Sequence, residues 1–178
     1  TTGTLDAATD NTGVGIEALD ALTSGDNNTA VGFQAGSKIN SGGSNTIVGR
    51  QAGDEVTSGN NNTAVGVAAL GTSSTTSNNT AIGTNALKLA TGANNVGLGK
   101  DAGDSVAAGV SNVCLGTDAG QNITSGSGNI VIGTADAGSA TGDHQLLIAG
   151  YNGSSTVTWM DGDSSGNVTF PAEIDGAT

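Results

Sequence analysis

The stretch NNTAVGFQAG, residues 27–36, returns along the chain in slightly altered form. With Asn-Thr-x-Val-Gly-x-x-Ala as the unit, its asparagine falls at Asn11, Asn28, Asn45, Asn62, Asn79, Asn95, Asn112 and Asn129. The successive spacings are 17, 17, 17, 17, 16, 17 and 17 residues, so eight copies fill residues 11–142. A fixed period of this length is typical of a repeat protein in which each copy packs on the next.

Each copy begins with a short apolar segment. The residues one and three places after the asparagine are β-branched or aliphatic, as in Thr63 and Val65 or Thr80 and Ile82, which predicts a short strand. We expect Val65 and Ile82 to point into a core. The residue between them is also apolar or small, so both faces of the strand should be covered. These middle residues include Ala30, Ile47, Ala64, Ala81, Cys114 and Val131.

The second half of a copy carries one aliphatic residue among polar ones, eleven places after the asparagine. Examples are Leu22, Ile39, Val56, Val106 and Ile123. This pattern predicts a second strand with one buried face. Seventeen residues then form one circuit of two strands and two turns, and stacked circuits rise about 4.7–4.9 Å per coil. The fold class is therefore all-β, a parallel β-solenoid of eight coils.

The repeated asparagine and the single cysteine both have a role in such a stack. An asparagine at the same turn of every coil can bond the copies above and below it, as in the ladders of stacked strands. We expect this structural ladder to include Asn28, Asn45, Asn62, Asn79, Asn95 and Asn112. The alternative is that asparagine serves only as a turn residue that tolerates a left-handed conformation. Cys114 occupies the small apolar slot of its copy, which favours core packing.

The two ends of the chain depart from the repeat. Residues 1–10 are predicted to be a cap or linker, and residues 143–178 a small C-terminal β cap or neck. Tyr151, Trp159 and Phe170 all lie in the latter, in a segment that reads as three strands joined by Gly- and Asp-rich turns. A solenoid needs such a cover, because its last coil otherwise presents an apolar layer and an unpaired strand edge.

Composition excludes several classes of protein. The net charge is −12, from 16 acidic and four basic residues, which argues against a nucleic-acid partner. No run of 18 apolar residues is present, so we expect no membrane insertion. The sequence shows no signal peptide, although a leader removed before Thr1 stays possible.

Candidate chemical sites are few. Residues 97–103, GLGKDAG, resemble a phosphate-binding loop, but the other copies share the layout and no βαβ unit surrounds it. No catalytic set can be assembled, so we expect neither enzyme activity nor a cofactor. Asp161 and Asp163 are the only metal candidates, for calcium, and a plain turn is the favoured interpretation. A rank of threonines from Thr12 to Thr80 suggests ice binding, but it lies on the strand expected to be buried.

Copies such as NNTAVGVAAL and NNTAIGTNAL resemble the head repeats of trimeric autotransporter adhesins. They are more similar to the related repeats of bacteriophage tail fibres and other virion appendages, which often end in an aromatic segment with a turn like residues 162–168 here. The resemblance covers residues 11–142 well and residues 143–170 loosely. It implies a left-handed β-roll, three chains side by side, and a structural or adhesive role.

These observations predict a non-catalytic structural protein of a bacteriophage virion, a homotrimeric fibre or appendage. Its expected partners are other virion proteins and a glycan or protein of the host surface. The alternatives are a capsid decoration or cement trimer, the head of an adhesin on a bacterial cell surface, and an ice-binding solenoid. The trimer contact is assigned to the middle residues of the strands, although the residues alone do not decide which strand face looks inward. Those residues are Ala30, Ile47, Ala64, Ala81, Cys114 and Val131.

Overall fold

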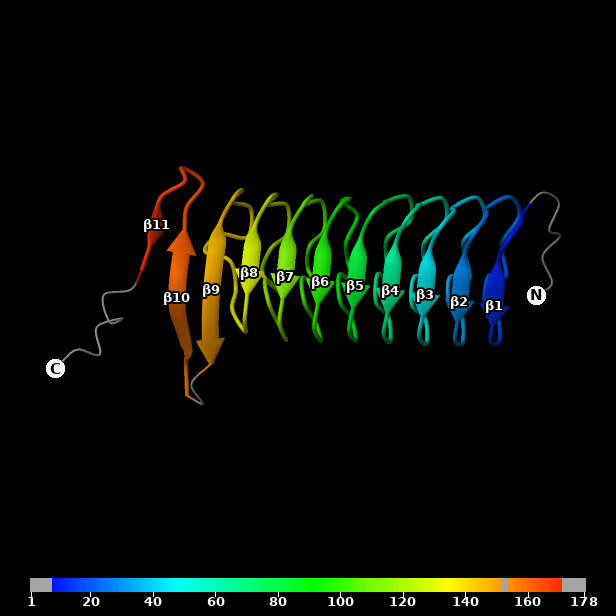
Figure 1. Cartoon of the computed structure of the whole chain (residues 1–178), viewed down its shortest axis with the longest axis horizontal. Coiled ribbons are helices and arrows are strands. Elements are labelled where there is room, and N and C mark those ends of the chain that lie inside the picture. Colours follow the sequence, from blue (N-terminus) through cyan, green and yellow to red (C-terminus); the bar gives the residue numbers. More distant parts are fainter. Residues whose placement is uncertain (1–7, 152–153, 171–178) are drawn as a thin grey trace.

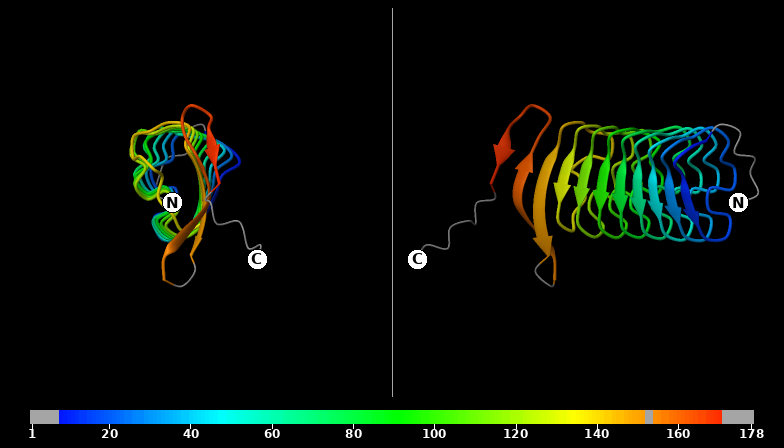
Figure 2. Two further views of the ribbon diagram at one scale, coloured as in Figure 1. Left: turned by 90° about the vertical axis from the view of Figure 1, so that its left-hand side faces the viewer. Right: turned by 45° about the vertical axis from the view of Figure 1, so that its right-hand side comes forward.

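The computed structural model describes residues 8–151 and 154–170, and within these ranges the chain is all-β with no helix. Eleven strands form one sheet in chain order, and the coils stack behind it into a straight rod (Figure 1). Viewed along the rod, the sheet is one wall and the turns close the circuit on the other side (Figure 2). The predicted β-solenoid is therefore confirmed.

One strand of three residues marks each coil, and like positions pair in parallel. Thr46 pairs with Thr63 and Val48 with Val65. The single 16-residue interval keeps this register, since Thr80 pairs with Val96. The strands are β1 Thr12–Val14, β2 Thr29–Val31, β3 Thr46–Val48, β4 Thr63–Val65, β5 Thr80–Ile82, β6 Val96–Leu98, β7 Val113–Leu115 and β8 Ile130–Ile132.

The second half of each coil is a series of turns, so the predicted second strand is wrong. Gln34 and Gly36 have left-handed backbone angles, with φ of 55° and 56°. The amide of Ile39 donates to the carbonyl of Gly36 (3.1 Å) within the coil, while the amide of Gly36 donates to Ala52 of the next coil (3.0 Å). The predicted burial of the aliphatic residue holds, because its side chain fills the interior. Leu22, Ile39, Val56, Val106 and Ile123 are all buried.

The strands bury their middle residue, which reverses our expectation for Val65 and Ile82. Ala64 and Ala81 are fully buried, whereas Val65 is half-buried and Ile82 is 37% exposed. Side chains alternate along a strand, so a buried middle residue sends both of its neighbours outward. Cys114 lies in the core as predicted, and burial raises the pKa of its thiol to about 12.

In several coils the core exchanges size between two positions, whereas the first coil has leucine at both, Leu19 and Leu22. Where the eighth place after the asparagine is Gly36, the eleventh is Ile39, and a Cβ on Gly36 would lie 2.8 Å from Ile39 Cδ1. Where the eighth place is Leu70, the eleventh is the small Ser73, and both are buried. Leu70 has a φ of 54°, a conformation that leucine rarely adopts. Filling the interior outweighs this backbone cost.

The C-terminal segment continues the sheet beyond the last coil. Strand β9 (Leu146–Tyr151) pairs in parallel with β8, and β10 (Thr156–Gly162) and β11 (Val168–Thr169) follow antiparallel. The three predicted strands are thus present. A bulge lies between Thr158 and Met160, and the ring of Trp159 lies against Gly150, where an added Cβ would be 2.5 Å from Trp159 Cζ2.

The first described residues already follow the solenoid. Asp10 has a φ of 58°, close to the 60° of Asn27 at the same place in the next coil. The carbonyl of Thr9 accepts a hydrogen bond from the amide of Asn27 (3.0 Å). Residues 8–10 therefore form the end of a coil. The rest of the segment predicted as a cap or linker, and residues 152–153 and 171–178 of the predicted C-terminal cap, lie outside the described residues.

Candidate interaction surfaces

The asparagine ladder fixes the coils to one another. Asn45 donates from Nδ2 to Asn28 Oδ1 (3.0 Å) and to the carbonyl of Gly59 (2.9 Å). Its own Oδ1 accepts from the backbone amide and from Nδ2 of Asn62, at 2.9 and 3.0 Å. The ladder asparagines from Asn28 to Asn129 are buried. The structure thus shows the ladder that the repeat predicts.

The ladder has an unpredicted end and an interruption. Gln145 is the last rung, and both its backbone amide (2.8 Å) and its Nε2 (3.2 Å) donate to Asn129 Oδ1. The sequence contains a signal for this rung, since Gln145 lies 16 residues after Asn129. In the middle of the rod, Asn79 donates from Nδ2 to the Oγ1 of Thr76, three residues before it in the chain (3.2 Å). The side-chain-to-side-chain links therefore form two runs, from Asn11 to Asn62 and from Asn95 to Gln145.

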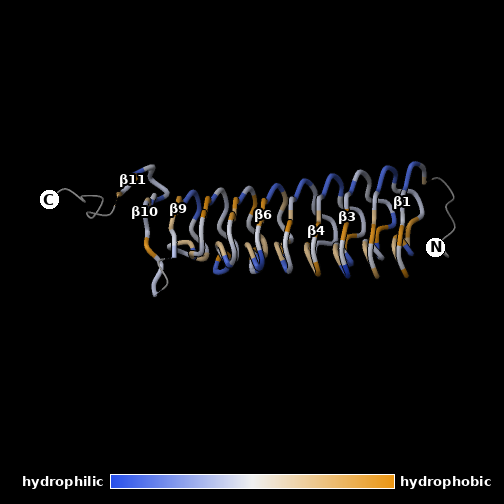
Figure 3. Tube along the Cα trace, turned by 60° about the horizontal axis from the view of Figure 1, so that its bottom comes forward, coloured by the Kyte–Doolittle hydropathy of each residue, from blue (hydrophilic) through white to orange (hydrophobic). Residues whose placement is uncertain are grey.

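The sheet turns an apolar face to the outside along the whole rod, and we call it the outer face. Its first row comprises Thr12, Thr29, Thr46, Thr63, Thr80, Val96, Val113 and Ile130, and its second row Val14, Val31, Val48, Val65, Ile82, Leu98, Leu115 and Ile132. Neither row contains a charged residue. Figure 3 shows apolar segments, in orange, in coil after coil. In the second row Val14 is 57% exposed.

This geometry corrects the predicted trimer contact. The residues assigned to it have no exposed surface, because they pack into the core of their own chain and cannot touch another copy. They are Ala30, Ile47, Ala64, Ala81, Cys114 and Val131. The exposed apolar side of the same strands is the outer face. The threonine rank also lies there, and not on a buried face as expected.

A third row follows the glycine after each strand. It comprises Ile16, Phe33, Arg50, Val67, Thr84, Lys100, Thr117 and Thr134. In the first four coils this row is apolar except for Arg50, and Ile16 is 71% exposed. From Thr84 onward the row is polar. The first row changes in the opposite sense, from threonine to Val96 and its successors.

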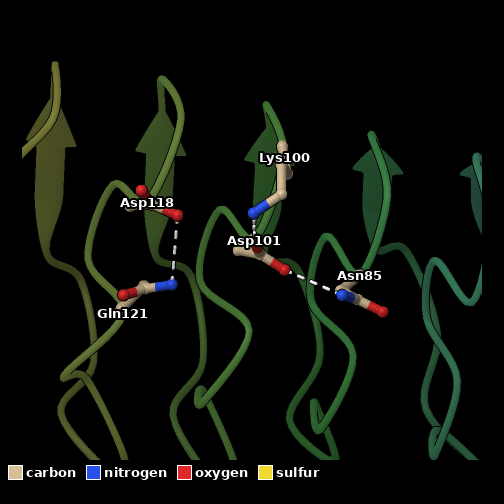
Figure 4. A network of polar contacts seen from close by, with 5 residues as sticks. All are labelled: Asn85, Lys100, Asp101, Asp118 and Gln121. Carbon is tan, nitrogen blue, oxygen red and sulfur yellow. Dashed lines mark hydrogen bonds and ion pairs between the residues drawn. The ribbon is translucent and has the colours of Figure 1, made fainter.

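Beside the third row, left-handed turn residues carry polar side chains that meet between coils. Gln34 donates from Nε2 to Glu17 Oε2 (2.6 Å), and Gln51 to Gln34 Oε1 (3.0 Å). Further along, Asp101 pairs with Lys100 and accepts from Asn85 Nδ2 (2.8 Å), as Figure 4 shows.

The carboxylates of this turn region differ in their pKa. The hydrogen bond from Lys100, with a second from Asn85, lowers the pKa of Asp101. Burial raises the pKa of Asp104, and the neighbouring Asp101 and Asp118 add to the rise. Asp118 accepts from Gln121 Nε2 at 3.2 Å (Figure 4). These contacts stabilise the turns internally.

The two metal candidates lie at the C-terminal hairpin. Asp161 and Asp163 line an open pocket of about 280 Å³ together with Asp143. The carboxylate of Asp163 accepts from the backbone amides of Ser165 (2.9 Å) and Asn167 (3.0 Å) and from Asn167 Nδ2 (2.8 Å). Over residues 8–151 and 154–170, no three His, Cys, Asp or Glu side chains are grouped so that they could hold a metal. The carboxylate of Asp163 therefore holds the backbone of this turn in place, in agreement with the interpretation of the segment as a plain turn.

We expect this turn to loosen in acid. The hydrogen bonds from Asn167 lower the pKa of Asp163, so its stabilising effect is complete above the ordinary carboxyl pKa and disappears as the pH falls through the lowered value. The amide chemical shifts of Ser165 and Asn167 should therefore titrate with a midpoint below about 3.9. In Asp163→Asn the two amides should not titrate. A midpoint at or above the ordinary carboxyl pKa would contradict the assignment.

In the part of the chain that the structure describes, no helix is long and apolar enough to cross a membrane. Comparison of the chain with protein-family models, with curated proteins and with solved structures finds no match in any of the three.

Proposed function

We propose that this chain is a non-catalytic structural protein that associates through its outer face into a homotrimer, and that the trimer forms a fibre or similar appendage of a bacteriophage virion. The observation that carries the proposal is the uncharged apolar face along the full length of a rod. A face of this kind favours association, whereas the polar turns on the other sides keep the assembly soluble.

The size of the outer face supports an interface. Eight strands at about 4.8 Å each give a length of roughly 38 Å, and the two rows run along all of it without a charged residue. A continuous uncharged strip of this length, with several of its aliphatic side chains exposed, marks a site of association.

Association should depend on the centre of the outer face. Leu98, the sixth of the eight residues of the second row, is 41% exposed, so Leu98→Glu leaves the core intact but places a charge in the contact. We expect the unmodified protein to sediment at three times the chain mass of 16.9 kDa, and Leu98→Glu to sediment as a folded monomer. Ser41→Glu adds the same charge at an exposed turn and should remain trimeric. A folded monomer of the unmodified protein at micromolar concentration contradicts the trimer.

The place of the trimer in a virion rests on the resemblance of repeats such as NNTAVGVAAL to those of virion appendages. Electron microscopy of phage particles labelled with antibodies against this chain tests it. Label on a fibre supports the proposal, and label distributed over the capsid supports the decoration protein instead. Label on the surface of uninfected bacteria supports the adhesin head, with a host glycan or protein as its partner.

Ice binding is the second candidate, because the threonine rank lies on the outer face. Thr12, Thr29, Thr46, Thr63 and Thr80 are in register along the sheet. From Val96 onward the row is aliphatic, so the rank covers only part of the rod. A trimer covers this rank and should show no thermal hysteresis. Hysteresis from a monomer would favour ice binding over the structural role.

A further inference from the structure

We propose that the C-terminal hairpin, β9 and β10, is an association element as well as a cap, and that its outer side packs against a second copy of this chain. This inference rests on the proposed homotrimer. It extends the contact beyond the eight coils and places Trp159, the one tryptophan of the chain, inside it.

The hairpin has two different faces. Leu147 pairs with Val131 of the core row, so Leu147 faces the interior of the last coil, and Ala149, two places further on, is buried. This inner side covers the coil, as a cap must. Ile148 lies between the two and points the other way, in register with Ile132 of the outer face. The outer face therefore continues from the coils onto the hairpin.

The outer side of the hairpin is apolar. Met160 pairs with Ile148 and Val157 with Gly150, and residues directly opposite each other in antiparallel strands share a face. Trp159, at the bulge, lies on the same side, because an outward Cβ on Gly150 would be 2.5 Å from Trp159 Cζ2. Val157 is 38% exposed and Trp159 57%. A segment that only covered the last coil would not need these exposed apolar side chains.

The outer face is broadest at the hairpin. In a coil the strand has three residues and ends before a glycine with a positive φ, as at Gly133 (104°) after β8. Ala149 stands at the corresponding place in β9, and the strand runs on to Tyr151. Because β9 has six residues and β10 seven, both project past the coils, as Figure 1 and Figure 2 show. The hairpin thus gives a partner more of the sheet to contact than any coil does.

A second copy of this chain fits this surface better than a glycan does. Asp161 pairs with Leu147 and so faces the inner side. The outward side chains carry no charge and donate no hydrogen bond except through the indole N–H, and they are Leu146, Ile148, Val157, Trp159 and Met160. A glycan would be held by several placed polar groups, which this surface lacks.

The charge of the chain also favours a second copy at this surface. Each copy carries a net charge of −12, so two copies can approach closely only where charges are absent. A second copy presents an outer face that is apolar and uncharged over the same strands. Its ridges also repeat at the same strand spacing, so the side chains of the two copies can interdigitate.

The single tryptophan reports on this contact directly. We measure the emission maximum of Trp159 and its quenching by acrylamide in the unmodified protein and in Leu98→Glu, which is expected to be monomeric. In the trimer the partner covers the indole ring, so emission should lie at shorter wavelength and quenching should be weaker than in the monomer. Sedimentation velocity of the same samples gives the oligomeric state and, over a range of concentrations, the association constant.

Val157→Glu and Val110→Glu form a matched pair of variants. The two valines are exposed to a similar extent, 38% and 40%, but Val110 lies in the turn before β7, outside the strands. Val157→Glu should weaken association at least about 30-fold, the effect of losing a central contact of about 2 kcal/mol, and should leave Trp159 open to acrylamide. Val110→Glu should change association by less than about threefold. If a glutamate prevents folding, which far-UV circular dichroism shows, Val157→Thr and Val110→Thr should give the same order.

The outcomes separate this inference from the function on which it rests. A trimer in which Trp159 is as accessible as in the monomer leaves the hairpin outside the contact, so the inference is then wrong while the trimer stands. Protection of Trp159 that appears only when lipopolysaccharide is added identifies a glycan as the occupant, which also overturns the inference. An unmodified protein that is monomeric at micromolar concentration overturns the proposed trimer, and this inference with it.

Discussion

Gly66→Ala is expected to destabilise the solenoid by at least about 4 kcal/mol, a large part of the 5–15 kcal/mol that holds a typical domain together. Gly66 has a φ of 137°, a conformation that residues with a Cβ rarely adopt. Its added Cβ would also lie 2.4 Å from the carbonyl oxygen of Gly83 in the next coil. Gly66 and Gly83 both belong to backbone that pairs between coils. Neither residue can therefore move aside without separating the coils.

Unfolding in guanidinium followed by circular dichroism measures this effect. Gly13→Ala is the matched control, because Gly13 occupies the strand position where β4 carries Ala64. A Cβ there would have its nearest neighbour at 3.4 Å, which is ordinary contact. The control should therefore shift stability by less than about 1 kcal/mol. Equal effects of the two substitutions would show that the glycine after the strand is not required by the stacking.

Asn45→Ala is expected to cost about 3–5 kcal/mol, because it removes a rung from the buried ladder. The change deletes two donated and two accepted hydrogen bonds. It leaves the carbonyl of Gly59 and the amide of Asn62 without these partners in an interior from which water is excluded. Each buried polar group left without a partner costs about 1–3 kcal/mol.

The control for the ladder is Asn40→Ala. Asn40 is exposed and its side chain meets only the hydroxyl of the neighbouring Ser41 (3.0 Å). This variant should unfold within about 0.5 kcal/mol of the unmodified protein. If Asn45→Ala were equally mild, the asparagine would act only as a turn residue, which is the alternative that the sequence left open.

The period predicted the fold because it constrains every coil at once. A residue type that recurs at the same place in eight stacked coils, such as the asparagine, lies next to its counterparts in the neighbouring coils. The repeat therefore predicted the ladder as well as the strands. The C-terminal strands were predicted from ordinary local signals, the aliphatic segment around Leu147 and the Gly-rich turns.

The orientation of the strands could not be predicted in the same way. Thr63, Ala64 and Val65 can each be buried in a core. The alternation of side chains along the strand therefore allows either Ala64 or its two neighbours to point inward. In the structure Ala64 faces the core, and the turns that follow the strands contain Ala68 and Leu87 at left-handed angles that their residue types do not suggest. Because the predicted orientation of the strands was wrong, the residues assigned to the trimer contact lie in the core. The exposure of the second row was not predicted for the same reason.

The interruption of the ladder at Asn79 has a mechanical consequence. A rod pulled at its ends passes the load from coil to coil in series, so the weakest junction sets the force at which it parts. Between Asn62 and Asn95 the rungs are joined only through the backbone amides of Asn79 (3.0 Å) and Asn95 (2.9 Å), without the side-chain link present elsewhere. A tensile load should therefore split the rod near its middle, into two segments that each retain a continuous ladder.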